Sequence, residues 1–134
     1  VEDGELVLAA VDEEELLRFE VASPVGSWHV IDSGGFENPI PGVQITATFT
    51  EEGELRGGAG CNTYRSTYTT DRGAITILPA AATRKFCAEP KGVMEQESRY
   101  LAALASAARF RVDGNILRLS RADGTAVVSF GRRL

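Results

Sequence analysis

Histidine, cysteine, methionine and tryptophan are scarce in this chain, and their scarcity limits the chemistry available to it. The 134 residues include one histidine, two cysteines, one methionine and one tryptophan. A zinc site of the His/Cys type needs about four ligands, and a nucleophilic serine or cysteine needs a base beside it. The single imidazole, His29, alternates out of phase with Trp28 and Val30 on an expected strand. We therefore predict no enzyme activity, no catalytic residue, no cofactor and no metal.

Long apolar runs, basic clusters and phosphate-binding loops are also missing. No run approaches the roughly 18 apolar residues of a membrane-spanning helix. The net charge is −5 and the basic residues are scattered, which argues against a nucleic-acid partner. The glycine-rich residues 57–60 do not precede a helix, as a phosphate-binding loop requires. The sequence begins with valine, so a leader or lipid anchor ahead of it is an open expectation.

The chain has the length of one domain, and the pattern of residues 1–22 indicates a separate unit ahead of it. Eleven residues separate Leu8 from Phe19 in the leading segment, and the same spacing separates Leu119 from Phe130 near the end. We interpret residues 1–22 as the closing β-hairpin of a preceding, similar repeat plus a linker. Residues 23–134 are then the domain itself, expected to be a monomer within a tandem chain.

Alternation of apolar and polar residues predicts a fold rich in β-strands. The clearest strand spans 43–50, and others are expected near 27–31, 54–60, 64–70, 74–78 and 110–130. The one convincing helix spans about 90–108, with an apolar stripe formed by Met94, Glu97, Leu101, Leu104 and Ala108. A curled sheet of this size needs a cover for its concave face. We predict an α+β fold: an antiparallel, strongly curved sheet or cracked β-barrel with one amphipathic helix packed on it.

The two cysteines, Cys61 and Cys87, lie on segments that we expect to meet. A disulfide between them would close a loop of about 27 residues and stabilise the fold by ~3.5 kcal/mol. Such a bond is expected outside the cytosol, whereas inside it two buried free thiols are the alternative.

An ordered set of residues resembles the META domain, the family of the heat-shock protein HslJ. The set comprises Gly60-Cys61-Asn62, Tyr64, Tyr68, Thr83, Cys87, Met94, Glu97 and Leu104, with Trp28, Leu119 and Phe130 fitting the same pattern. The resemblance implies the cracked-barrel fold, a Cys61–Cys87 disulfide and an extracytoplasmic location in the periplasm, at the cell surface or secreted, with lipid anchoring open. Proteins of this kind are linked to heat stress and antibiotic tolerance.

Two interpretations apply to Glu97, which lies on the apolar stripe of the helix. It is either a perturbed carboxylate in a ligand cavity or a structural glutamate that pairs with Arg84, with Thr83, or with backbone N–H groups near the Gly60-Cys61-Asn62 bend. We favour the structural interpretation. Asn62 is expected to hold the bend that presents Cys61, because asparagine amides satisfy backbone groups in turns.

The preferred function is a non-catalytic domain of the cell envelope with a structural or binding role and an unidentified protein or envelope partner. The alternative is a carrier of a small apolar ligand, held in a barrel cavity. Its expected lining is Trp28, Phe49, Tyr68, Leu101 and Leu104.

Overall fold

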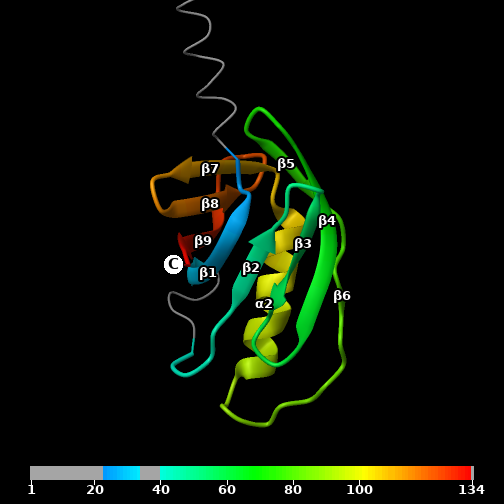
Figure 1. Ribbon diagram of the computed structural model, residues 1–134. Coiled ribbons are helices and arrows are strands. Elements are labelled where there is room, and N and C mark those ends of the chain that lie inside the picture. The colour runs from blue at the N-terminus through cyan, green and yellow to red at the C-terminus, as the bar shows by residue number, and fades with distance from the viewer. Residues whose placement is uncertain (1–22, 34–39, 134) are drawn as a thin grey trace, which may run out of the picture.

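The computed structural model describes residues 23–33 and 40–133 of the chain (Figure 1). Within them, one antiparallel sheet of nine strands curls into a ring, and one α-helix packs on it. This confirms the predicted α+β architecture of a strongly curved sheet with a single helix. The hairpin and linker expected in residues 1–22 lie outside the described residues.

The strands follow the alternation seen in the sequence. In β2, Ala47 and Phe49 are buried while Thr46 and Thr48 are only half-buried. Alternation places every second side chain on the same face of a strand, so one face becomes the core. The strands are β1 (Gly26–Ser33), β2 (Thr46–Phe49), β3 (Glu54–Gly58), β4 (Thr63–Asp71), β5 (Ala74–Ile77), β6 (Ala81–Ala82), β7 (Arg109–Asp113), β8 (Ile116–Ser120) and β9 (Ala126–Arg132).

The strand order explains the ring. Neighbouring strands run β3-β2-β1-β9-β8-β7-β5-β4-β6, and a further pairing of β3 with β4 closes the circle. Every strand pairing is antiparallel. The β5–β7 seam is short, with Ala74 opposite Arg109 and the Ile75 N–H donating to the Ala108 carbonyl at 3.0 Å. The barrel is therefore closed, with a short seam between β5 and β7.

The helix α2 (Val93–Ser106) lies behind β2, β3 and β4 in the view of Figure 1. It begins after Gly92, whose φ is 88°, and Glu95 lies in its first turn, where the helix dipole favours a negative charge. It ends at Ala107, whose N–H bonds to the Leu104 carbonyl. This span falls inside the predicted 90–108.

The buried face of α2 differs from the predicted stripe. The buried residues are Val93, Gln96, Glu97, Tyr100 and Leu104. Met94 and Leu101 are only half-buried, and Ala108 lies beyond the end of the helix. The prediction was right for Glu97 and Leu104, but the rest of the buried face is formed by Val93, Gln96 and Tyr100. Tyr100 is buried with its hydroxyl bonded to that of Tyr64. Gln96 is buried with its Oε1 accepting the Ile40 N–H, while its Nε2 has no hydrogen-bond partner among the described residues.

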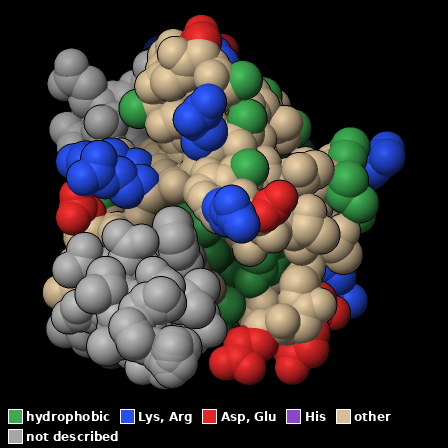
Figure 2. All heavy atoms as spheres, turned by 90° about the horizontal axis from the view of Figure 1, so that it is seen from above, with side chains coloured by type: hydrophobic (Ala, Val, Ile, Leu, Met, Phe, Trp, Pro, Cys, Tyr) green, Lys and Arg blue, Asp and Glu red, His purple; other side chains and the backbone are tan. Residues whose placement is uncertain are grey.

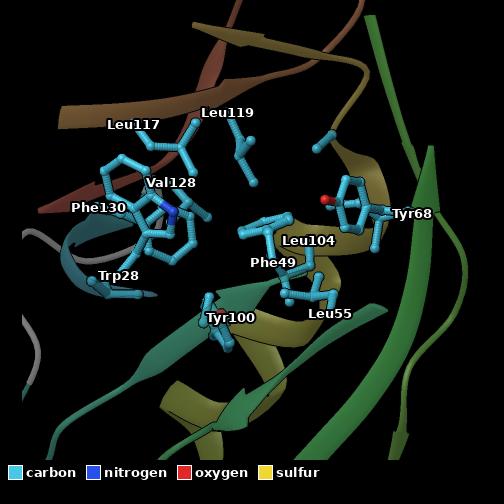
Figure 3. Close-up of a cluster of buried hydrophobic side chains, with 14 of the residues drawn as sticks. Trp28, Phe49, Leu55, Tyr68, Tyr100, Leu104, Leu117, Leu119, Val128 and Phe130 are labelled. Atoms are coloured by element: carbon cyan, nitrogen blue, oxygen red, sulfur yellow. The ribbon is translucent and has the colours of Figure 1, made fainter. Parts of the chain in front are cut away.

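A hydrophobic core fills the inside of the ring (Figure 3). Phe49 lies near its centre, with its ring centroid 5.0 Å from that of Tyr68 and 6.5 Å from that of Phe130, both edge to face. Aromatic pairs in this geometry contribute ~0.5–1.5 kcal/mol beyond the area they bury. These contacts join β2, β4 and β9 across the interior.

Charges of both signs are spread over the end of the molecule that Figure 2 views from above. Lysine and arginine side chains alternate there with acidic ones, and hydrophobic side chains show in a depression between them. The described side chains at this end therefore carry charges of both signs.

Candidate functional site

The two cysteine segments meet at a bend beside the start of α2. Cys61 follows Gly60, whose φ of 120° lies in a region that glycine adopts without strain. Cys87 lies between β6 and α2. A disulfide joins the two residues, whose Cα atoms are 6.0 Å apart across a sequence separation of 26. The expected meeting is confirmed, and the alternative of two free thiols is wrong.

Glu97 reaches this bend from α2, and its side chain is only 6% exposed. One carboxylate oxygen, Oε1, accepts hydrogen bonds from the backbone N–H groups of Cys61 at 3.0 Å and Asn62 at 2.7 Å. The other, Oε2, accepts from Asn62 Nδ2 at 2.7 Å. Of the partners considered from the sequence, the amides of the bend contact the carboxylate directly, while Thr83 and Arg84 do not. Hydrogen bonds to a charged group are roughly twice as strong as neutral ones, so this group ties the helix to the bend.

Asn62 connects that carboxylate to a third segment. Its Oδ1 accepts hydrogen bonds from Thr83 Oγ1 at 2.8 Å and from the backbone N–H of Lys85 at 2.6 Å. Its Nδ2 donates to the Lys85 carbonyl at 3.1 Å as well as to Glu97. The asparagine therefore joins segments distant in sequence, which goes beyond its expected role within its own bend. We call this set the clasp: Cys61, Asn62, Thr83, Cys87 and Glu97.

Two buried tyrosines lie next to the clasp. The hydroxyls of Tyr64 and Tyr100 are 2.5 Å apart, and Tyr64 also donates to the Thr46 carbonyl at 2.8 Å. Burial raises the pKa of both phenols above the ordinary value near 10. Tyr100 was not among the predicted site residues, although it lies three residues after Glu97 and four before Leu104, the spacing of one helical face.

The side chains proposed as the lining of a ligand cavity pack against other core residues. Trp28, Phe49 and Leu104 are at most 1% exposed, and Leu101 is half-buried against the same core. Trp28 donates from Nε1 to the Pro24 carbonyl at 2.7 Å.

Tyr68, the remaining residue of that set, lies at the edge of the core. Its hydroxyl donates to the Thr50 carbonyl at 2.5 Å. Burial raises the pKa of this phenol, and the nearby charges of Glu51 and Glu52 raise it further. Tyr68 also borders a surface hollow of about 430 Å³ beside the two glutamates.

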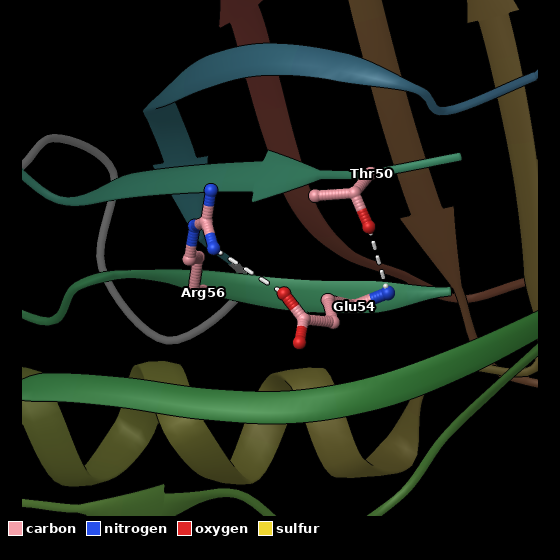
Figure 4. Close-up of polar contacts among 3 residues, drawn as sticks. All are labelled: Thr50, Glu54 and Arg56. Carbon is pink, nitrogen blue, oxygen red and sulfur yellow. Dashed lines mark hydrogen bonds and ion pairs between the residues drawn. The ribbon is translucent and has the colours of Figure 1, made fainter. Parts of the chain in front are cut away.

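A larger hollow lies on the outer face of the sheet, at residues that were not predicted to form a site. It has a volume of about 630 Å³ and is bordered by β2, β3, β4 and β6. We call it the outer-face hollow, and its defining residues are Thr46, Arg56, Gly58, Thr63, Arg65 and Thr83. Figure 4 shows Arg56 projecting from β3 toward β2, with α2 behind the sheet. A sequence signal was available, because Arg56 and Arg65 flank the glycine-rich residues 57–60.

Possible metal ligands are dispersed over the part of the chain that the structure describes. No three His, Cys, Asp or Glu side chains among them come together in a way that could hold a metal ion. His29 lies on β1 beside Gly131 of β9, where a Cβ atom on the glycine would approach the imidazole to 3.2 Å. Within the same part of the chain, no helix is long and apolar enough to cross a membrane.

Comparison with known proteins agrees with this fold. No curated protein matches the chain. A protein from Burkholderia xenovorans, solved by NMR, is 25% identical with a TM-score of 0.64, and the match covers 81% of each chain. A crystal structure of a DUF4847 family protein from Bacteroides vulgatus is 17% identical with a TM-score of 0.61, covering 85% of this chain and 96% of that one. The sequence profile of the META domain matches residues 20–133, and the chain therefore belongs to the META domain family.

Proposed function

We propose that this META domain is a non-catalytic module of the cell envelope that acts outside the cytoplasm by binding a partner. The observation that carries the proposal is the clasp, in which a disulfide, a buried carboxylate and a buried amide hold three segments together. A role in stress tolerance, as suggested by the family resemblance, would require a fold that stays intact under heat or chemical stress.

The disulfide supports the extracytoplasmic location. Disulfides form and persist in oxidising compartments and are rare in the reducing cytosol. Here the bond closes a loop between residues 26 apart, for which the chain-entropy estimate gives ~3.5 kcal/mol of stabilisation. A domain with a total stability of about 5–15 kcal/mol would lose a large part of it in a reducing compartment.

The geometry of the clasp supports a structural role for its carboxylate. A general acid or base must reach a substrate proton with a free position on the carboxylate. Both oxygens of Glu97 instead accept hydrogen bonds from protein N–H groups, and the side chain is buried. The carboxylate of Glu97 therefore stabilises the contact between the helix and the bend.

Trapping of thiols in living cells of the source organism tests this proposal. Cells are quenched with acid, the chain is denatured, and free thiols are labelled with a polyethylene glycol maleimide before and after reduction. We expect no labelling before reduction, labelling of both cysteines after it, and recovery of the chain in the envelope or secreted fraction. A cytoplasmic chain with two thiols that label without reduction would refute the proposed location.

A further inference from the structure

The outer-face hollow combines a positive wall with a floor of small residues. Its only charged lining side chains among the described residues are Arg56 and Arg65. The remaining lining is mainly threonine, glycine and alanine. A hollow of about 630 Å³ falls within the usual size of small-ligand sites, which is roughly 300–1,000 Å³.

The two arginines are placed directly opposite each other on neighbouring strands. Arg56 of β3 is the register partner of Arg65 of β4. Like charges in this position destabilise a sheet, so the pair gathers positive charge beside the hollow at a cost in stability. Glu54 offsets one charge through an ion pair with Arg56 at 3.2 Å. Arg65 is exposed and makes no ion pair with another described residue.

The floor of the hollow contains Gly58, a position where the packing of the strands would also allow a side chain. At Gly57, a Cβ atom would lie 2.1 Å from the Thr46 carbonyl oxygen, so close strand packing demands glycine there. At Gly58 the nearest atom to such a Cβ is Thr46 Oγ1 at 3.7 Å, an ordinary contact. Gly58 therefore keeps space free in the hollow without being needed for the fold.

Hydroxyl groups border the same space. Thr46 Oγ1 accepts the Gly58 N–H at 3.0 Å, so its own O–H is free to donate to a ligand. Thr83 Oγ1 accepts from the Thr63 N–H at 3.2 Å and donates to Asn62 Oδ1, so the clasp fixes its orientation. The border thus offers oriented neutral groups next to a cationic pair.

We propose that the outer-face hollow binds a saccharide unit that carries an anionic group, either a carboxylate or a phosphate. A guanidinium forms paired hydrogen bonds with either anion, so Arg65 and Arg56 would bind the anionic group of the ligand. The threonine hydroxyls match the hydroxyls of a sugar ring, and the glycine floor lets the ring approach the backbone. This deepens the proposed envelope role and rests on it, because the ligand would be a polymer accessible in that compartment.

Titration of the full chain with defined probes tests the site. The probes are a galacturonate oligomer for the carboxylate source, a glycerol phosphate oligomer bearing sugars for the phosphate source, a neutral galactose oligomer and poly-glutamate. We expect saturable binding of at least one anionic saccharide, weakened by salt, with NMR shifts centred on the amides of Gly57, Gly58 and Thr63. Neutral galactose and poly-glutamate should bind at least about tenfold more weakly, since each lacks one of the two recognised features.

Three variants distinguish specific binding in the hollow from nonspecific electrostatic attraction. Arg65→Gln and Gly58→Val should each weaken binding of the anionic saccharide by about tenfold or more, the second without changing the charge. The matched control is Arg118→Gln, because Arg118 also lies directly opposite an arginine, Arg111, but on the β7–β8 pair and away from the hollow. Arg118→Gln should leave binding unchanged.

Several results would overturn the assignment. They are equal losses in Arg65→Gln and Arg118→Gln, equal binding of poly-glutamate, or no binding of any anionic saccharide by a chain shown to be folded and oxidised. None of these results would alter the thiol-trapping outcome, so this proposal and the proposed extracytoplasmic role can fail separately.

Discussion

Replacing Glu97 with alanine would remove the acceptor on which the clasp depends. Three N–H groups now donate to this carboxylate: the backbone amides of Cys61 and Asn62, and Asn62 Nδ2. Asn62 is 3% exposed and Glu97 6% exposed, so the donors left behind would lie in a site that water reaches poorly. We therefore expect the substitution to be strongly destabilising.

The magnitude follows from the number of donors that lose their partner. A buried donor without a partner costs about 1–3 kcal/mol, and water entering the new space recovers part of that cost. For three donors we expect Glu97→Ala to lower the free energy of unfolding by about 3–5 kcal/mol, a large share of the roughly 5–15 kcal/mol typical of a domain.

Exchanging the hydrogen-bonding groups between positions 97 and 62 gives a sharper test. Glu97→Gln can keep the two bonds at Oε1 but turns an N–H toward Asn62 Nδ2, so two donors face each other. Asn62→Asp creates the opposite conflict, with two carboxylates in contact. In the double variant the new amide at 97 can donate to the new carboxylate at 62. We expect a favourable coupling energy of about 2 kcal/mol between the two substitutions.

Urea titration followed by circular dichroism, without reductant, measures these differences. Glu95→Ala is the matched control, since Glu95 lies exposed in the first turn of the same helix. It should change stability by less than about 1 kcal/mol. A Glu97→Ala variant as stable as the Glu95→Ala control, or a double variant showing no coupling, would refute the role assigned to the carboxylate.

Three further predictions concern the disulfide, the tyrosine pair and the close approach of β2 to β3. Reduction should lower the free energy of unfolding by ~3.5 kcal/mol, measured by urea titration with and without reductant, and an unchanged midpoint would contradict this. Because burial raises the pKa of Tyr64 and Tyr100, the folded chain keeps protons that the unfolded chain releases; stability is fully present below about pH 10 and falls above it by ~1.4 kcal/mol per pH unit for each tyrosine. Titrations at rising pH should show a shallower fall in Tyr64→Phe, and an equal slope would argue against the assignment. Gly57→Ala places a Cβ atom 2.1 Å from the Thr46 carbonyl oxygen and should cost about 2 kcal/mol or more in thermal or urea unfolding, whereas Gly58→Ala should cost little; equal costs would disprove the close approach.

Local patterns determined much of the secondary structure. Alternation fixed which side chains of β2 and β4 face inward, because successive residues of a strand point to opposite faces. The helix could also be located from the sequence, because its apolar residues recur every three or four positions. The ordered residues from Gly60 to Leu104 also identified the family, a prediction that the profile match confirms.

The face of the helix could not be read from hydrophobicity alone. Buried Gln96 and Tyr100 each hydrogen-bond to a distant segment, and the partners, the Ile40 N–H for Gln96 Oε1 and the Tyr64 hydroxyl for Tyr100, lie 56 and 36 residues away in the sequence. A local window contains no information about such partners. For the same reason, the sequence left three candidate partners for Glu97. The structure shows that the backbone N–H groups of the bend are the ones that bind it.

The sequence by itself determined the type of most elements, though not the strand β6, and it determined the inward residues of the clearest strands and the pair of cysteines that could join. Only the tertiary structure decided that β3 pairs with β4 to close the ring, that Asn62 joins three segments, and that Arg56 lies opposite Arg65 beside a hollow. The physical reason is that side-chain periodicity is a property of neighbouring residues. Strand register and buried hydrogen bonds instead depend on which distant segments the collapsed core brings together.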